Sequence, residues 1–168
     1  MASPSILISG PVNTSKESLL RKIVNNLDND FESVLSISTL QSRIIESSDL
    51  LPITASSEIS PEDLTGIGIE ITSWLDDTKE PRLVTLENLS TLLMYHDSET
   101  LFRFLHIVKS RLESDDTPLI CIEDTTEDTP KVQPHMKLFD YIVFTRLSDG
   151  SLQYNVKKNS EDLPKLKM

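Results

Sequence analysis

The start of the chain combines the two signals that most restrict its fold, a buried-strand pattern followed directly by a helical one. Residues 5–9 form a short apolar run that Gly10 and Pro11 end, and such a run fits a strand buried on both faces. After Ser15, apolar side chains recur at helical spacing, at Leu19, Leu20, Ile23, Val24 and Leu27. A strand, a loop and a helix in this order predict an α/β fold.

The rest of the chain repeats this alternation. We expect further strands over residues 33–38, 82–87, 118–122 and 140–146, and helices over residues 39–48, 61–76 and 98–114. Ser60 is the expected cap of the helix over residues 61–76. An Asp-Gly turn at Asp149 and Gly150 predicts a hairpin into a last strand over residues 152–156. The pattern therefore predicts a mostly parallel central sheet with a C-terminal β-hairpin.

Composition narrows the possible functions. The 168 residues include 27 acidic and 16 basic side chains, a net charge of -11, which repels nucleic-acid phosphates. No apolar run approaches the ~20 residues that a transmembrane helix needs, and the first residues lack a signal-peptide pattern. We expect a cytoplasmic protein without a membrane segment. The single cysteine, Cys121, has no partner for an internal disulfide, and the three scattered histidines form no zinc-type cluster.

The loop over residues 10–17 stands between a strand and a helix, the context of the phosphate-binding pattern G-x-x-x-x-G-K-[ST]. Gly10 and Lys16 match the pattern. Ser15 replaces the glycine that allows a left-handed turn close to phosphate, and Glu17 replaces the hydroxyl that binds magnesium. Two interpretations stay open: a degenerate phosphate loop in which these residues and Thr14 keep some nucleotide contact, and a capping box between Thr14 and Glu17, which we favour.

Two acidic positions follow later strands. Glu87 ends the strand over residues 82–87, where a nucleotide hydrolase holds the carboxylate that orients magnesium, although a strand-ending carboxylate is also often a cap or a salt-bridge partner. Residues 123–128 contain four carboxylates. If their strand lies beside the first strand, this loop faces the phosphate position and opposes nucleotide binding. We interpret it as a solvated acidic loop rather than a cation site, because its spacing does not match an EF-hand.

Two further positions have simpler interpretations. Arg103 and His106 lie about one turn apart on the helix over residues 98–114, and we expect them to point away from the core and to contact a partner. Cys121 lies inside an apolar strand, where a buried and inert thiol is the expected state.

The quoted segments resemble a known family. Residues 10–17 and 82–93 are similar to the phosphate-loop and magnesium-strand segments of RecA/KaiC-type ATPases. Four segments resemble more specifically a group of uncharacterised haloarchaeal proteins with a RecA/KaiC-like core, namely residues 61–69, 89–95, 102–106 and 138–140. The similarity covers residues 6–156, and a degenerate P-loop is common in that group. A halophilic origin agrees with the acidic composition, since high salt screens the repulsion between carboxylates.

The resemblance implies a three-layer RecA-like fold of the P-loop NTPase type, with residues 1–156 as the domain and residues 157–168 as a flexible, lysine-containing tail. We expect a non-catalytic binding or regulatory domain without a nucleotide cofactor, which acts through protein-protein interaction as a homo-oligomer or with a paralogous RecA/KaiC-like protein. The alternative is a weak or partner-completed ATPase in which Lys16 contacts ATP and Glu87 orients Mg²⁺. A recombinase accessory protein that touches DNA is disfavoured by the net charge.

Overall fold

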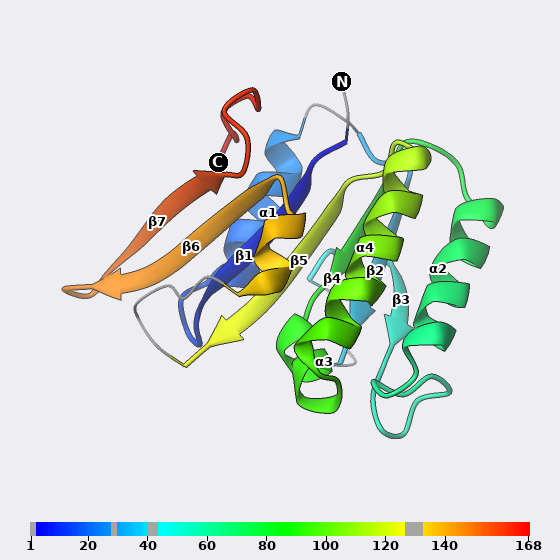
Figure 1. The fold of residues 1–168 in the computed structure, drawn as a ribbon. Helices are drawn as coiled ribbons and strands as arrows, with labels where there is room; N and C mark the ends of the chain where they lie inside the picture. Colours follow the sequence, from blue (N-terminus) through cyan, green and yellow to red (C-terminus); the bar gives the residue numbers. More distant parts are fainter. Residues whose placement is uncertain (1–2, 28–29, 40–43, 127–132) are drawn as a thin grey trace.

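The computed structural model describes residues 3–27, 30–39, 44–126 and 133–168. Within them, seven strands form one sheet in the order β3-β2-β4-β5-β1-β6-β7, and neighbouring strands are parallel except for β6 and β7 (Figure 1). The strands are β1 (Ser5–Pro11), β2 (Ser33–Ser38), β3 (Asp49–Pro52), β4 (Arg82–Leu86), β5 (Leu119–Thr125), β6 (Tyr141–Ser148) and β7 (Ser151–Lys158). The expected mostly parallel sheet with a terminal hairpin is confirmed.

Helices cover both faces of this sheet (Figure 1). One face carries α1 (Lys16–Asn26), and the other carries α2 (Leu64–Asp77), α3 (Leu89–Tyr95), α4 (Ser98–Ser114) and the short 3-10 helix η1 (Pro134–Leu138). Among the described residues, no helix has both the length and the apolar character needed to cross a membrane.

The position of strand β1 explains why its middle residues, 6–8, are all apolar. Leu7 belongs to the core cluster on the face of α2, α4 and η1, whereas Ile6 and Ile8 belong to the cluster on the opposite face, with α1. Successive side chains of a strand point to opposite faces, so a strand between two helical layers needs an apolar residue at each step. All three side chains are fully buried, as expected.

Three elements differ from the expectation. The helix expected over residues 39–48 falls partly outside the described residues, and its described residues 44–48 form turns and bends. Helix α2 begins at Leu64, and its cap is Asp63, whose carboxylate accepts a hydrogen bond from the Gly66 amide at 2.8 Å. The expected cap at Ser60 is therefore wrong. Helix α3 had no sequence prediction, because it is too short to show a clear helical period.

The hairpin is longer than its sequence pattern. Strand β7 continues to Lys158, so it includes two residues that the sequence assigned to the tail. Beyond it, the Tyr141 hydroxyl donates to the Pro164 carbonyl oxygen at 2.6 Å, and Leu163 and Leu166 pack against the core on the α1 face. The end of the chain thus contacts the sheet on the side that carries α1.

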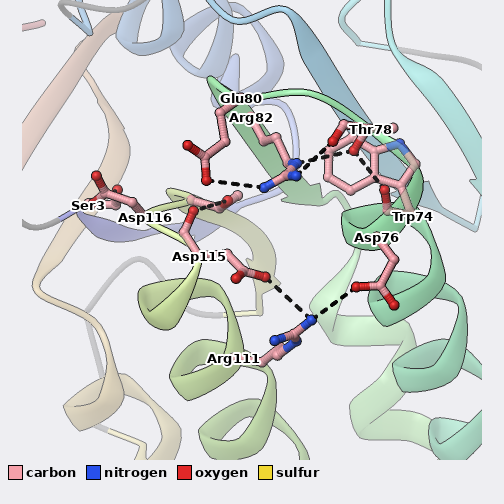
Figure 2. Close-up of polar contacts among 10 residues, drawn as sticks. Ser3, Trp74, Asp76, Thr78, Glu80, Arg82, Arg111, Asp115 and Asp116 are labelled. Atoms are coloured by element: carbon pink, nitrogen blue, oxygen red, sulfur yellow. Dashed lines mark hydrogen bonds and ion pairs between the residues drawn. The ribbon is translucent and has the colours of Figure 1, made fainter.

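Two arginines make polar contacts near the C-terminal ends of α2 and α4 (Figure 2). Nη2 of Arg111 on α4 lies 3.4 Å from Oδ1 of Asp76 on α2 and 3.5 Å from Oδ2 of Asp115. Arg82 at the start of β4 donates to the carbonyl oxygen of Thr78, just after α2, at 2.7 Å. Helices α2 and α4 are therefore tied to each other, and α2 is tied to the sheet, at their C-terminal ends.

Candidate functional site

The loop between β1 and α1 holds the residues that the sequence singled out for phosphate binding. It lies at the carboxyl end of β1, beside the carboxyl end of the parallel neighbour β5 (Figure 1), which is where α/β sheets bind ligands. Two of its residues have a left-handed backbone conformation: Asn13 has a φ of 65° and Ser15 a φ of 55°. A non-glycine residue adopts this conformation at a cost of about 1–2 kcal/mol. The left-handed turn therefore forms although serine replaces the second glycine.

Thr14 does not act as a helix cap. Its hydroxyl lies 2.6 Å from the Pro11 carbonyl oxygen and 2.6 Å from Oγ1 of Thr145 on β6. The residue at the cap position is Ser15, and its side chain makes no capping hydrogen bond. The expected capping box between Thr14 and Glu17 is therefore wrong. The threonine instead holds the loop against β6.

Gly10 is required by the closeness of β6. A Cβ atom at this position would overlap Oγ1 of Thr145 and lie 2.6 Å from the Thr145 carbonyl oxygen. These atoms belong to the neighbouring strand, so a side chain at residue 10 would push β1 and β6 apart. The first glycine of the pattern is thus explained by strand packing.

Lys16 folds back over its own loop and is 3 % exposed. Its Nζ lies 2.6 Å from the Pro11 carbonyl oxygen, 3.0 Å from that of Gly10 and 3.4 Å from Thr14 Oγ1. It also forms an ion pair of 2.8 Å with Oδ1 of Asp124. An ammonium group has three N–H donors, so these acceptors satisfy all of its hydrogen-bonding capacity.

Asp124 brings the acidic loop to the lysine, as the position of β5 beside β1 predicted. It is the cross-strand partner of Gly10. Ser90 on α3 fixes its backbone, because the Ser90 hydroxyl accepts from the Asp124 amide at 2.6 Å and lies 3.2 Å from the Asp124 carbonyl oxygen. The Asp124 side chain is 43 % exposed. Of the other expected carboxylates, Glu127 and Asp128 lie outside the described residues.

Glu87 belongs to a different cluster. It follows β4, is 9 % exposed, and accepts a hydrogen bond from Thr85 Oγ1 at 3.1 Å. Burial raises the pKa of its carboxyl group, and hydrogen bonds from Ser36, Thr85 and Ser38 oppose this shift only in part. These three partners lie on β2 and β4, and the contacts described for Lys16 do not include Glu87. Among the described residues, no group of three or more His, Cys, Asp or Glu side chains is placed to hold a metal ion.

On the other face of the sheet from Lys16, three buried side chains are joined by hydrogen bonds that the sequence did not predict. The Ser9 hydroxyl donates to Glu123 Oε1 at 2.8 Å, and Nε2 of His135 on η1 lies 2.6 Å from Glu123 Oε2. Successive side chains of a strand point to opposite faces of the sheet, so Glu123 and its neighbour Asp124 on β5 lie on different faces. The sequence alone allowed this prediction. No sequence pattern pointed to His135. Each of the three is 3 % exposed or less, so they fasten η1 to the sheet and are not accessible to a substrate.

Cys121, on the same strand as Glu123, is fully buried. Burial, with a smaller contribution from the charge of Glu123, raises the pKa of its thiol. The expected burial of this cysteine is therefore confirmed, and a raised pKa disfavours the thiolate, which is the reactive form.

Arg103 and His106 are exposed on α4, as expected. Arg103 pairs with Glu99 on the same helix, and the ring of His106 stacks on that of Phe102 with centroids 6.4 Å apart. Neither residue is among the contacts of the lysine loop. Their role in partner binding stays a prediction.

A groove runs between α2 and α4. It has a volume of about 540 Å³ and is lined by six apolar side chains, four hydroxyl side chains, Gly68 and Arg111. Two of the apolar side chains, Ile69 and Ile107, are 59 % and 67 % exposed. The groove lies on the face opposite α1, away from the contacts of Lys16.

The fold and the loop define an α/β protein with a mostly parallel sheet, in which the lysine of a strand-loop-helix unit is bound by the protein's own oxygen atoms. Residues 6–144 match the family described as "Family of unknown function (DUF7504)", and the chain belongs to that family. The comparison with curated proteins finds no match.

Proposed function

We propose that this protein is a non-catalytic RecA/KaiC-like domain whose nucleotide site is closed, and that it acts by binding another protein chain. The observation that carries the proposal is the saturated ammonium group of Lys16, which two carbonyl oxygens, a hydroxyl and Asp124 surround. A triphosphate would have to displace these contacts. It would also meet the negative charges of Asp124 and Glu17.

The sheet supports the RecA-like part of the proposal. The strand that precedes the lysine loop, β1, lies inside the sheet, and β4, which Glu87 follows, lies two positions away, with β5 between them. This places the lysine loop and the candidate magnesium strand on the same edge of a parallel sheet. A halophilic, cytoplasmic setting belongs to the same proposal and is supported by the net charge of -11.

Binding of Mg-ATP tests the closed site. We expect no heat of binding when wild-type protein is titrated with Mg-ATP in molar KCl, a salt concentration that screens long-range repulsion between the acidic protein and the nucleotide. Micromolar binding that Lys16→Ala abolishes would refute the proposal and favour the ATPase alternative. The described residues give that alternative little support, because the carboxyl group of Glu87 is buried among hydroxyl groups away from Lys16.

The partner is expected to be a second copy or a paralogous RecA/KaiC-like protein. The groove between α2 and α4 supports this part of the proposal, because Ile69 and Ile107 expose apolar surface there. Light scattering is expected to give a mass above that of one chain, or a stable complex with a co-expressed paralogue. Ile69→Asp and Ile107→Asp should each weaken that assembly. Leu147→Asp is the matched control, since Leu147 is 51 % exposed on the hairpin. A larger loss from Leu147→Asp would move the interface away from the groove.

A further inference from the structure

We propose that Asp124 is an internal anion that takes the place of a phosphate-type ligand at Lys16, and that this contact keeps the loop over residues 10–17 closed to anions from solution. The inference rests on the proposed function and names the group that closes the site. The sequence interpretation gave Ser15, Glu17 and the acidic loop over residues 123–128 as groups that oppose nucleotide binding, and the inference assigns the contact with Lys16 to one residue of that loop.

The charge balance around Lys16 assigns this role to Asp124. Among the contacts described for the ammonium group, the carboxylate of Asp124 is the only charged one, and the other three are neutral oxygen atoms. The lysine side chain is 4 % exposed, so it has lost nearly all of its contact with water. A buried cation requires an anionic partner, because neutral acceptors do not replace its hydration.

The exposure of Asp124 shows from which side an anion would come. Its side chain is 43 % exposed while that of Lys16 is 4 % exposed, so the carboxylate stands between the ammonium group and the solvent. An anion that approaches Lys16 must therefore take the position of this carboxylate. The two negative groups compete for one cation, and the internal one needs no association from solution.

The surrounding backbone holds Asp124 in place without its side chain. Its Cα pairs with that of Gly10 across the strands, and its amide donates to Ser90 Oγ. The left-handed turn at Ser15 and the hydrogen bond between Thr14 and Thr145 also involve no atom of Asp124. Removal of the carboxylate should thus leave the loop folded and the ammonium group of Lys16 without a charged partner.

The test is isothermal titration with metal-free inorganic pyrophosphate at about 0.1 M salt, where charges more than ~10 Å apart are largely screened. We compare wild type with Asp124→Asn and Asp124→Ser; two replacements guard against one that fails to fold, which circular dichroism detects. Asp76→Asn is the matched control, because it removes one carboxylate paired with a different cation, Arg111. We expect both Asp124 variants to bind at least about tenfold more tightly than wild type and the control, since a like charge beside the ligand is removed.

Each outcome decides the proposal. Binding by the Asp124 variants that Lys16→Ala abolishes supports it. Folded Asp124 variants that bind no better than Asp76→Asn overturn it and leave the proposed function intact, because the site is then closed by another group. Wild-type protein that binds pyrophosphate as tightly as the Asp124 variants, through Lys16, overturns both the internal-anion role and the closed site.

Discussion

The hydrogen bond between Glu123 and His135 is the polar contact whose loss we expect to destabilise the protein most. His135→Ala leaves the carboxylate of Glu123, which is 3 % exposed, with Ser9 as its remaining hydrogen-bond donor. A buried polar group that loses its hydrogen-bond partner costs about 1–3 kcal/mol. For chains of this length, 1 kcal/mol shifts Tm by roughly 2–4 °C. The expected fall in Tm is therefore about 2–12 °C.

Urea unfolding and thermal scans near neutral pH measure this effect. Arg103→Ala is the control, since its partner is Glu99 and the two side chains are 72 % and 74 % exposed; such pairs contribute less than about 1 kcal/mol. Glu123→Gln, added to His135→Ala, should recover part of the lost stability, because it replaces the carboxylate that has lost its partner with a neutral amide. The reasoning is refuted if His135→Ala costs no more than Arg103→Ala, or if the added Glu123→Gln makes the protein still less stable.

Three further changes test other parts of the structure. Gly10→Ala should lower the free energy of unfolding by about 1–3 kcal/mol in urea titrations, because the new Cβ forces β1 away from Thr145; an unchanged midpoint would contradict the close approach. Burial raises the pKa of Glu87 above its ordinary value of 4.5, so its stabilising contribution is present below pH 4.5 and is lost as the pH rises through the folded pKa. Glu87→Gln should therefore gain stability relative to wild type as the pH rises above 4.5, and a difference that does not change with pH would refute the assignment. Hydrogen bonds lower the pKa of Asp97, and the largest contribution comes from the Thr100 amide. The stabilisation of α4 by this cap should therefore be lost as the pH falls through that lowered pKa. Asp97→Ala should remove this part of the acid dependence of Tm.

The sheet was predictable because its strands follow simple rules of periodicity. The middle of β1, residues 6–8, is apolar at each step, and the Asp-Gly turn marked the hairpin. The capping errors arose from competition between nearby groups. Ser60 and Asp63 both suit a helix start, and the local pattern does not tell which of them meets a free amide. Thr14 fitted a capping box, but contact with β6 determines its actual partners.

The candidate site was predictable only where sequence position sets spatial position. The carboxyl ends of β1 and β5 were expected to meet, and this brings Asp124 to Lys16. The pairing of Glu123 with His135 depends on how η1 packs on the sheet, and no periodic signal encodes that contact. The burial of Glu87 follows from hydroxyl groups of Ser36 and Thr85 on neighbouring strands, which a reading of the loop pattern does not include.

The cross-strand pairing of Gly10 with Asp124 has a consequence for how related sequences are compared. The residue that meets the lysine is far away in the chain, on another strand. A relative with an unchanged lysine loop can therefore differ in anion affinity through a single codon at the end of β5. Surveys that sort such proteins into nucleotide binders and non-binders should score this distant position together with the loop itself.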